Sequence, residues 1–192
     1  MKNIHRPGKA AFTLIELLAV ITIIVILAAV VVGSMGYVSE KQASEKAKVQ
    51  IALISKALED YKLDNGAYPA TSNTADGTKQ SSILFEALYY DAAKEGATPT
   101  GEYKIYLAEL DPATNKQGWT SGTASSSTKI LDPWGNEYRY RSAYGDAGAG
   151  GNASKNDNTL NPDFDLWSGG KDGKSSPASS GDKTNKDDIK NF

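Results

Sequence analysis

Residues 12–32, Phe-Thr-Leu-Ile-Glu-Leu-Leu-Ala-Val-Ile-Thr-Ile-Ile-Val-Ile-Leu-Ala-Ala-Val-Val-Val, form an apolar run that contains one carboxylate, Glu16. As a helix rising 1.5 Å per residue, the run spans the roughly 30 Å of a bilayer's hydrocarbon core. A carboxylate in that environment costs about 2.5–3.5 kcal/mol and normally needs a partner. No Lys, Arg or His lies between residues 10 and 40. The partner of Glu16 is therefore expected to come from elsewhere.

The residues before the run suggest how the chain sits in a membrane. Lys2, His5, Arg6 and Lys9 precede it, with no acidic residue among them. Because positive flanks stay cytoplasmic, we expect a cytoplasmic N-terminus and residues from about 40 onward across the membrane. Two other interpretations are a secretory signal peptide cut after Gly33 and a plain single-span anchor. The run is longer than the apolar core of a signal peptide, and a plain anchor leaves Glu16 unexplained.

Cleavage between Ala11 and Phe12 offers a third interpretation. It would create an α-amino group at Phe12 that is largely cationic near neutral pH. This group would lie one helical turn from Glu16, in the same chain or in a neighbouring copy. In a low dielectric, such a pair offsets much of the cost of burying both charges.

The segment Lys9-Ala-Ala-Phe-Thr-Leu-Ile-Glu16 resembles the N-terminal signal of type IV pilins and of the pseudopilins of type II secretion. The resemblance implies that a prepilin peptidase removes the basic leader 1–11. It also implies that Phe12 becomes N-methylated and that Glu16 serves in filament assembly. Ala11 departs from the pattern, because glycine is usual at that position.

Composition excludes several functions for the mature chain. The sequence has 192 residues, and without the leader 18 Lys and Arg face 23 Asp and Glu, a formal net charge of −5. This acidic balance gives no support for nucleic-acid binding. Cysteine is absent and the single histidine, His5, lies in the leader. Histidine acid–base catalysis, cysteine nucleophiles and Cys/His zinc sites are thus excluded. We expect that the protein is not an enzyme. We also expect that its exported domain is stabilised by a link other than a disulfide.

A helical pattern continues beyond the apolar run. The residues at positions 47, 51, 54, 58 and 61 form one apolar stripe with spacings of 4, 3, 4 and 3. Gly66 is suited to end the helix and Pro69 bars its continuation. We therefore predict one helix from Phe12 to about Leu63. The expected regions are a cleaved leader (1–11), a transmembrane and assembly helix (12–33), its amphipathic continuation (34–64) and a periplasmic globular domain (65–192) that ends in an acidic loop (169–192).

The globular region is expected to combine short elements with long loops. The pattern predicts a helix over Ile83–Tyr90, a turn at Asp132–Gly135, strands at Glu137–Arg141 and Asp163–Ser168, and loops over 118–128 and 143–162. Periodicity cannot decide between strand and helix for Tyr103–Leu107. The fold class is thus α+β, a pilin-like fold with one long N-terminal helix packed on a small antiparallel sheet.

Four further segments narrow the resemblance. Tyr61–Pro69, Asp132–Gly135, Asp165–Gly173 and Asp187–Phe192 resemble, in this order, the major pseudopilins of type II secretion, the general secretion pathway protein G family. The chain departs from that family by long insertions at 91–128 and 143–162, by a stretched segment between 172 and 187, and by Phe192 in place of tryptophan.

The resemblance implies a structural subunit of the bacterial inner membrane, polymerised through its helix into a periplasmic pseudopilus that supports export of folded proteins across the outer membrane. The implied partners are further copies of the chain, the prepilin peptidase, the inner-membrane assembly platform, the minor pseudopilins and, before assembly, membrane lipid. The alternatives are a type IV pilus subunit for adhesion or motility and an anchored or secreted soluble domain.

The acidic loop poses a separate question. Between residues 169 and 192 the only sizeable apolar side chains are Ile189 and Phe192, so burial alone does not order it. Its carboxylates either stay solvated or bind a hard cation through oxygen. The family resemblance implies one calcium ion. The implied ligands are Asp172, Asp187 and Asp188, with backbone oxygens near Gly169 and Asn185, and Asp182 as a replacement ligand.

Overall fold

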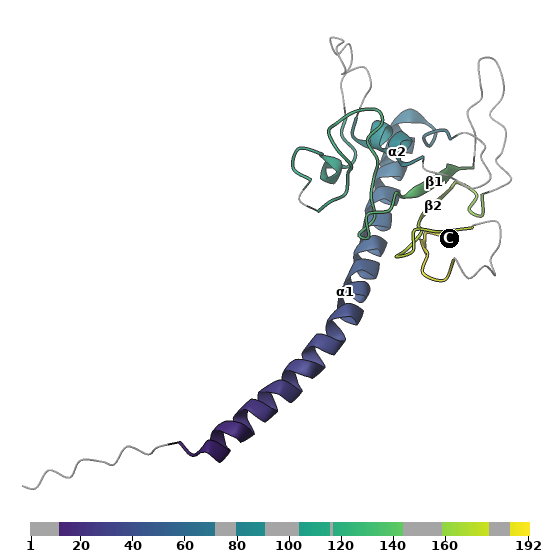
Figure 1. Ribbon diagram of the computed structural model, residues 1–192. Coiled ribbons are helices and arrows are strands. Elements are labelled where there is room, and N and C mark those ends of the chain that lie inside the picture. The colour runs from purple at the N-terminus through teal and green to yellow at the C-terminus, as the bar shows by residue number, and fades with distance from the viewer. Residues whose placement is uncertain (1–11, 72–79, 91–103, 116, 144–158, 177–184) are drawn as a thin grey trace, which may run out of the picture. The chain divides into compact units, whose positions relative to one another are not determined.

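The computed structural model describes residues 12–71, 80–90, 104–115, 117–143, 159–176 and 185–192 (Figure 1). It separates into two units, residues 1–41 and residues 42–192. Helix α1 (Leu14–Asn65) contributes to both and contains 52 residues. The predicted helix is confirmed, with each end two residues later than expected. Gly66 follows it with a φ of +79°, and its N–H donates to the Lys62 carbonyl at 2.7 Å, so the helix ends as its sequence indicated.

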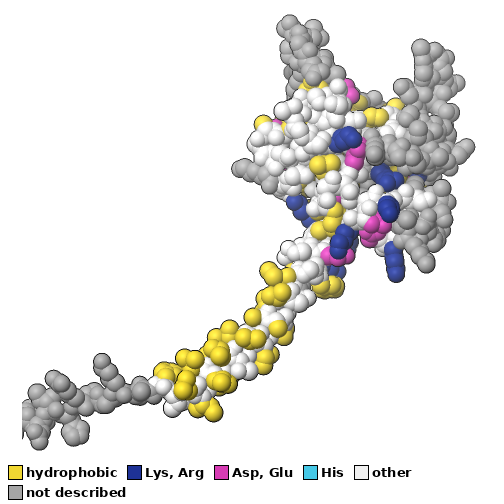
Figure 2. Space-filling view, in the orientation of Figure 1, with side chains coloured by type: hydrophobic (Ala, Val, Ile, Leu, Met, Phe, Trp, Pro, Cys, Tyr) yellow, Lys and Arg dark blue, Asp and Glu magenta, His cyan; other side chains and the backbone are white. Residues whose placement is uncertain are grey.

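The first unit is dominated by the apolar half of α1. Its large apolar side chains are at least half exposed over residues 14–32, and hydrophobic side chains cover most of its visible face (Figure 2). This helix is long and apolar enough to cross a membrane, and none of its most apolar window is buried within the chain. A helix that is hydrophobic all round needs lipid or other helices around it.

The second unit has one hydrophobic core. The predicted stripe of α1 enters it: Ala47, Ile54 and Leu58 are fully buried and Ile51 nearly so. Helix α2 (Ser81–Leu88) confirms the predicted short helix, beginning and ending two residues earlier. Further buried members of the cluster come from α2, from the 3-10 helix η2 (Ala108–Leu110) and from the strand region, and include Leu84, Phe85, Leu88, Leu110, Ile130, Tyr138, Tyr140, Phe164 and Leu166.

The segment Tyr103–Leu107, for which the sequence left strand and helix open, forms neither in its described part, residues 104–107. The N–H groups of Tyr106 and Leu107 both donate to the Leu88 carbonyl at the end of α2, at 2.9 and 3.3 Å. Two N–H donors that share one carbonyl do not form the ladder of hydrogen bonds that joins two β-strands. Tyr103 lies outside the described residues.

The sheet is antiparallel with the order β1-β2-β3. Its strands are β1 (Arg139–Ser142), β2 (Phe164–Ser168) and β3 (Ile189–Lys190). The strand predicted at 163–168 is confirmed. The strand predicted from Glu137 begins only at Arg139, because Glu137 forms an isolated bridge with Leu131. Strand β3 was not predicted. It pairs with Trp167 and Ser168 of β2, so the end of the acidic loop closes one edge of the sheet.

Candidate functional site

Glu16, the carboxylate within the apolar run, lies in the first turn of α1. The backbone N–H and the Oγ1 hydroxyl of Thr13 both donate to Glu16 Oε2, at 2.9 and 2.8 Å, and the Glu16 N–H donates back to Thr13 Oγ1 at 3.3 Å. This reciprocal arrangement is a capping box, and its Thr-x-x-Glu spacing was visible in the sequence. The expectation of a cationic partner from elsewhere did not use this spacing, and it stays a prediction. A cationic partner is still needed, because Thr13 carries no charge.

The predicted processing site lies at the edge of the described chain. Phe12 is its first residue, and its side chain is 84% exposed. Ala11 and the rest of the leader lie outside the described residues. Cleavage between Ala11 and Phe12 therefore stays a prediction.

The acidic loop is held together by side chains across the gap from 177 to 184, which is not described. The Asn185 amide bonds both backbone groups of Ser176, at 2.7 and 2.8 Å. The Asp172 N–H donates to Asp187 Oδ2 at 3.1 Å, and Ser175 Oγ donates to Asp188 Oδ2 at 2.6 Å. The structure thus brings Asp172 and Asp187 into contact and places Asp188 beside Ser175. The alternative ligand Asp182 lies in the undescribed gap.

Two glycines permit close approaches in this region, Gly170 to the other loop segment and Gly173 to Asn136 after the turn. Gly170 has a φ of +61°, and a Cβ atom there would overlap the carbonyl oxygen of Asp187. Gly173 has a φ of +64°, and a Cβ atom there would lie 2.6 Å from Asn136 Oδ1. A side chain at either position would strain the backbone and displace its neighbour.

Asp188 has an incompletely satisfied carboxylate. Its side chain has no exposed surface, and burial raises its pKa above the ordinary range for aspartate. Oδ2 meets Ser175 Oγ and, at 3.4 Å, Lys190 Nζ. Oδ1 is buried and has no hydrogen-bond partner among the residues that the structure describes. An oxygen left in this state is costly and suits a cation ligand.

The other implied ligands fit a cation only in part. Asp172 Oδ1 accepts the Lys174 N–H at 2.8 Å, and the Asn185 side chain is occupied by Ser176, so Asn185 would contribute only its backbone oxygen. In the described part of the chain, no group of three or more His, Cys, Asp or Glu side chains is arranged to hold a metal ion. Calcium takes six to eight oxygens and accepts backbone carbonyls. A calcium site here would therefore need carbonyls in addition to the Asp188 oxygen.

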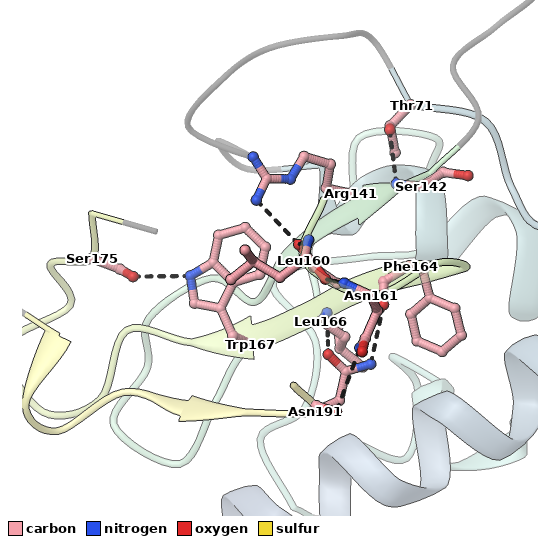
Figure 3. Close-up of polar contacts among 11 residues, drawn as sticks. Thr71, Arg141, Ser142, Leu160, Asn161, Phe164, Leu166, Trp167, Ser175 and Asn191 are labelled. Carbon is pink, nitrogen blue, oxygen red and sulfur yellow. Dashed lines mark hydrogen bonds and ion pairs between the residues drawn. The ribbon is translucent and has the colours of Figure 1, made fainter. Parts of the chain in front are cut away.

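The sheet supports the loop through residues that were not predicted from the sequence. Arg139 of β1 donates to the carbonyls of Gly173 and Ser175, at 3.3 and 3.1 Å. Trp167 of β2, which is paired with Arg139 across the sheet, donates its Nε1–H to Ser175 Oγ at 3.0 Å (Figure 3). The side chain of Asn191 bonds the backbone of Leu166 and Phe164, at 2.8 and 3.3 Å (Figure 3).

The turn at Asp132 links the sheet to the beginning of the loop. The Gly135 N–H donates to the Asp132 carbonyl at 2.9 Å, which confirms the predicted turn. Asp132 Oδ1 accepts the N–H groups of Trp134 and Asn136, at 3.0 and 2.8 Å. Oδ2 accepts the Ser168 hydroxyl at 2.5 Å. Burial raises the pKa of Asp132, and three donors depend on its carboxylate.

Replacing Asp132 by alanine should lower the free energy of unfolding by about 2–3 kcal/mol, because three donors lose their acceptor in a mostly buried setting. Asp132→Asn keeps one acceptor oxygen and should cost less. Urea unfolding of the full-length chain in detergent micelles, followed by tryptophan fluorescence, measures both changes. The matched control is Asp163→Ala, which removes an exposed carboxylate 3.5 Å from Lys62. An Asp132→Ala loss no larger than that of the control would contradict the role of the turn.

A long helix with an unburied apolar half and a small antiparallel sheet define a pilin-like α+β protein. Residues 6–32 match the prokaryotic N-terminal methylation motif, and residues 35–82 match the family "Type II secretion system (T2SS), protein G". The chain belongs to this family, as its relatives also show.

Three relatives are each named type II secretion system core protein G. The protein from Pseudomonas aeruginosa is 31% identical over 170 residues, covering 88% of this chain and 89% of its own length. The protein from Escherichia coli K12 is 33% identical over 68% of this chain and 70% of its own length. The protein from Vibrio cholerae is 30% identical over 77% and 79%. The family and the methylation motif support a pseudopilin subunit of the type II secretion system, and with the apolar helix they indicate membrane anchoring.

Proposed function

We propose that the chain is cut between Ala11 and Phe12, is held in the inner membrane with its globular domain in the periplasm, and polymerises with copies of itself into a pseudopilus. The pseudopilus would support the export of folded proteins across the outer membrane, with the assembly platform and minor pseudopilins as further partners. The chain would be a structural subunit and not an enzyme. The observation that carries this proposal is the exposed apolar helix that begins with a capped carboxylate, Glu16.

Insertion into the membrane and assembly into a filament both remove the apolar half of α1 from water. Among the residues that the structure describes, none covers the most apolar part of α1. Lipid covers it before assembly, and neighbouring helices cover it afterwards. Both Thr13 donors use Oε2 of Glu16, so neither of them occupies the other carboxylate oxygen, Oε1. The amine that cleavage creates at Phe12, in the same or a neighbouring subunit, supplies the cation that Glu16 needs.

The intact mass of the chain extracted from membranes tests the processing step. We expect a chain that lacks residues 1–11 and carries one added methyl group. The variant Ala11→Leu should stay uncut, because a bulky side chain replaces a small one at the cleavage site, whereas the control Ala11→Gly should be cut. A chain cut after Gly33 would have lost its apolar helix and would contradict the proposal.

We propose in addition that the acidic loop holds one calcium ion, with Asp172, Asp187, Asp188 and backbone oxygens near Gly169 and Asn185 as ligands. Two observations support this assignment: Asp188 Oδ1 is buried without a hydrogen-bond partner among the described residues, and the Asp172 N–H donates to the Asp187 carboxylate, which joins the two loop segments. The ion would link the two segments of the loop by oxygen coordination, as a staple for a domain without cysteine.

A further inference from the structure

Ser175 connects the sheet to the buried carboxylate of Asp188. Its Oγ lies 3.0 Å from Trp167 Nε1 and 2.6 Å from Asp188 Oδ2. Figure 3 shows the indole of Trp167, on β2, pointing its nitrogen at the Ser175 hydroxyl. The backbone of Ser175 is fixed as well, because its carbonyl accepts from Arg139 at 3.1 Å.

The chemistry of the three groups fixes the direction of these hydrogen bonds. An indole nitrogen only donates, so Ser175 Oγ accepts from Trp167. The single hydroxyl hydrogen of Ser175 is then left for Asp188, and an ionised carboxylate only accepts. The sheet thereby orients a serine as an obligatory donor to Asp188 Oδ2.

The hydrogen bond from Ser175 leaves the second carboxylate oxygen of Asp188, Oδ1, for a different partner. Oδ2 is engaged by Ser175 and by Lys190, whereas Oδ1 is buried and has no partner among the described residues. The next residue, Ile189, is paired in β3 with Ser168, which fixes the backbone beside Asp188, and the contacts of Oδ2 with Ser175 and Lys190 orient the side chain. The carboxylate is therefore presented in one orientation, with one oxygen committed and the other available.

We infer that Ser175 is a positioning residue for the cation site: it holds Asp188 in the orientation in which Oδ1 is a ligand, and it couples the site to the Trp167 indole. This inference rests on the calcium proposal. It adds that the hydrogen bond from Ser175 to Asp188 sets the affinity for calcium. It also adds that the environment of the Trp167 Nε1–H changes when calcium binds. Losing such a supporting hydrogen bond typically lowers metal affinity about 10- to 100-fold.

The test titrates the full-length chain in detergent micelles with calcium chloride, followed by calorimetry and by the ¹⁵N indole resonance of Trp167, assigned with Trp167→Phe. In the unsubstituted chain the resonance should shift along the same binding curve as the heat. Ser175→Ala should weaken calcium binding about 10- to 100-fold and uncouple the indole resonance from it. Ser176→Ala is the matched control, because the Ser176 bonds to Asn185 come from its backbone. The control should bind as the unsubstituted chain does, and Ser175→Thr, which keeps the hydroxyl, should largely restore binding.

Each other result counts against the inference. Equal affinity of Ser175→Ala and the unsubstituted chain overturns the positioning role and leaves the calcium proposal standing. No binding by the unsubstituted chain overturns both, and it leaves the filament proposal untouched. If circular dichroism shows that Ser175→Ala does not fold, Ser175→Cys replaces it. A thiol is a much weaker donor than a hydroxyl, so Ser175→Cys should bind calcium more weakly than Ser175→Thr, and equal affinity of these two variants and the unsubstituted chain overturns the inference as well.

Discussion

Replacing Glu16 by alanine should leave the leader cleaved and the chain in the membrane but abolish filament assembly. In the filament proposed above, the side chain of Glu16 would lie among apolar helices, with the Phe12 ammonium group as its partner. Removing one member of a buried ion pair costs about 3–5 kcal/mol, because the other charge stays buried and unpaired. A loss of that size lowers an association constant more than a hundredfold. Sheared filaments, measured by pelleting and by electron microscopy, report the effect, and intact mass reports the cleavage.

Two further variants separate the charge of Glu16 from its role as a helix cap. Glu16→Gln keeps an acceptor for Thr13 but removes the charge, so it should fail to assemble as Glu16→Ala does. Thr13→Val removes the hydroxyl of the capping box and keeps the charge. Loss of such a cap costs about 1 kcal/mol, so assembly should fall only moderately. Normal filaments from Glu16→Gln would show that Glu16 acts only as a helix cap and that its charge is not needed. Normal filaments from Glu16→Ala would refute its role in assembly.

The parts of the fold that the sequence predicts well are those governed by local periodicity. Helix α1 combines a continuous apolar run with an apolar stripe at helical spacing and ends at a glycine in the left-handed region, so its length and its end were both predictable. Strand β2 and the turn at Asp132 also have strong local signals. The Thr13–Glu16 capping box belongs to this class too, since its spacing is a local signal.

The parts that escaped prediction depend on contacts between distant residues. Strand β3 has two residues, too few for an alternating pattern, and exists because Trp167 and Ser168 offer it an edge. The placement of Ser175 depends on Trp167 and Arg139, which lie 8 and 36 residues from it in the sequence. Nothing local in a run of serines and lysines distinguishes Ser175 from Ser176.

Removing calcium should lower the melting temperature of the full-length chain by about 5–11 °C. An ion present at a hundred times its dissociation constant adds about 2.7 kcal/mol to the free energy of unfolding. For a domain of this size, each kcal/mol corresponds to about 2–4 °C. Thermal unfolding in detergent micelles, with calcium chloride or with EDTA, measures the shift.

The sharper form of this prediction concerns Asp188. Without the ion, its buried carboxylate has an oxygen with no partner among the described residues, so the charge itself is a burden on the fold. Asp188→Asn removes that charge and keeps nearly the same shape. It should therefore lose the calcium-dependent shift while melting in EDTA at or near the temperature of the unsubstituted chain. The control Asp163→Asn lies outside the loop and should keep the full shift. If EDTA changes neither the unsubstituted chain nor the control, no stabilising calcium ion is bound, and the hydrogen bonds of the loop hold it without an ion. If Asp188→Asn still responds to calcium, the ion is bound without Asp188, and the buried carboxylate has another role.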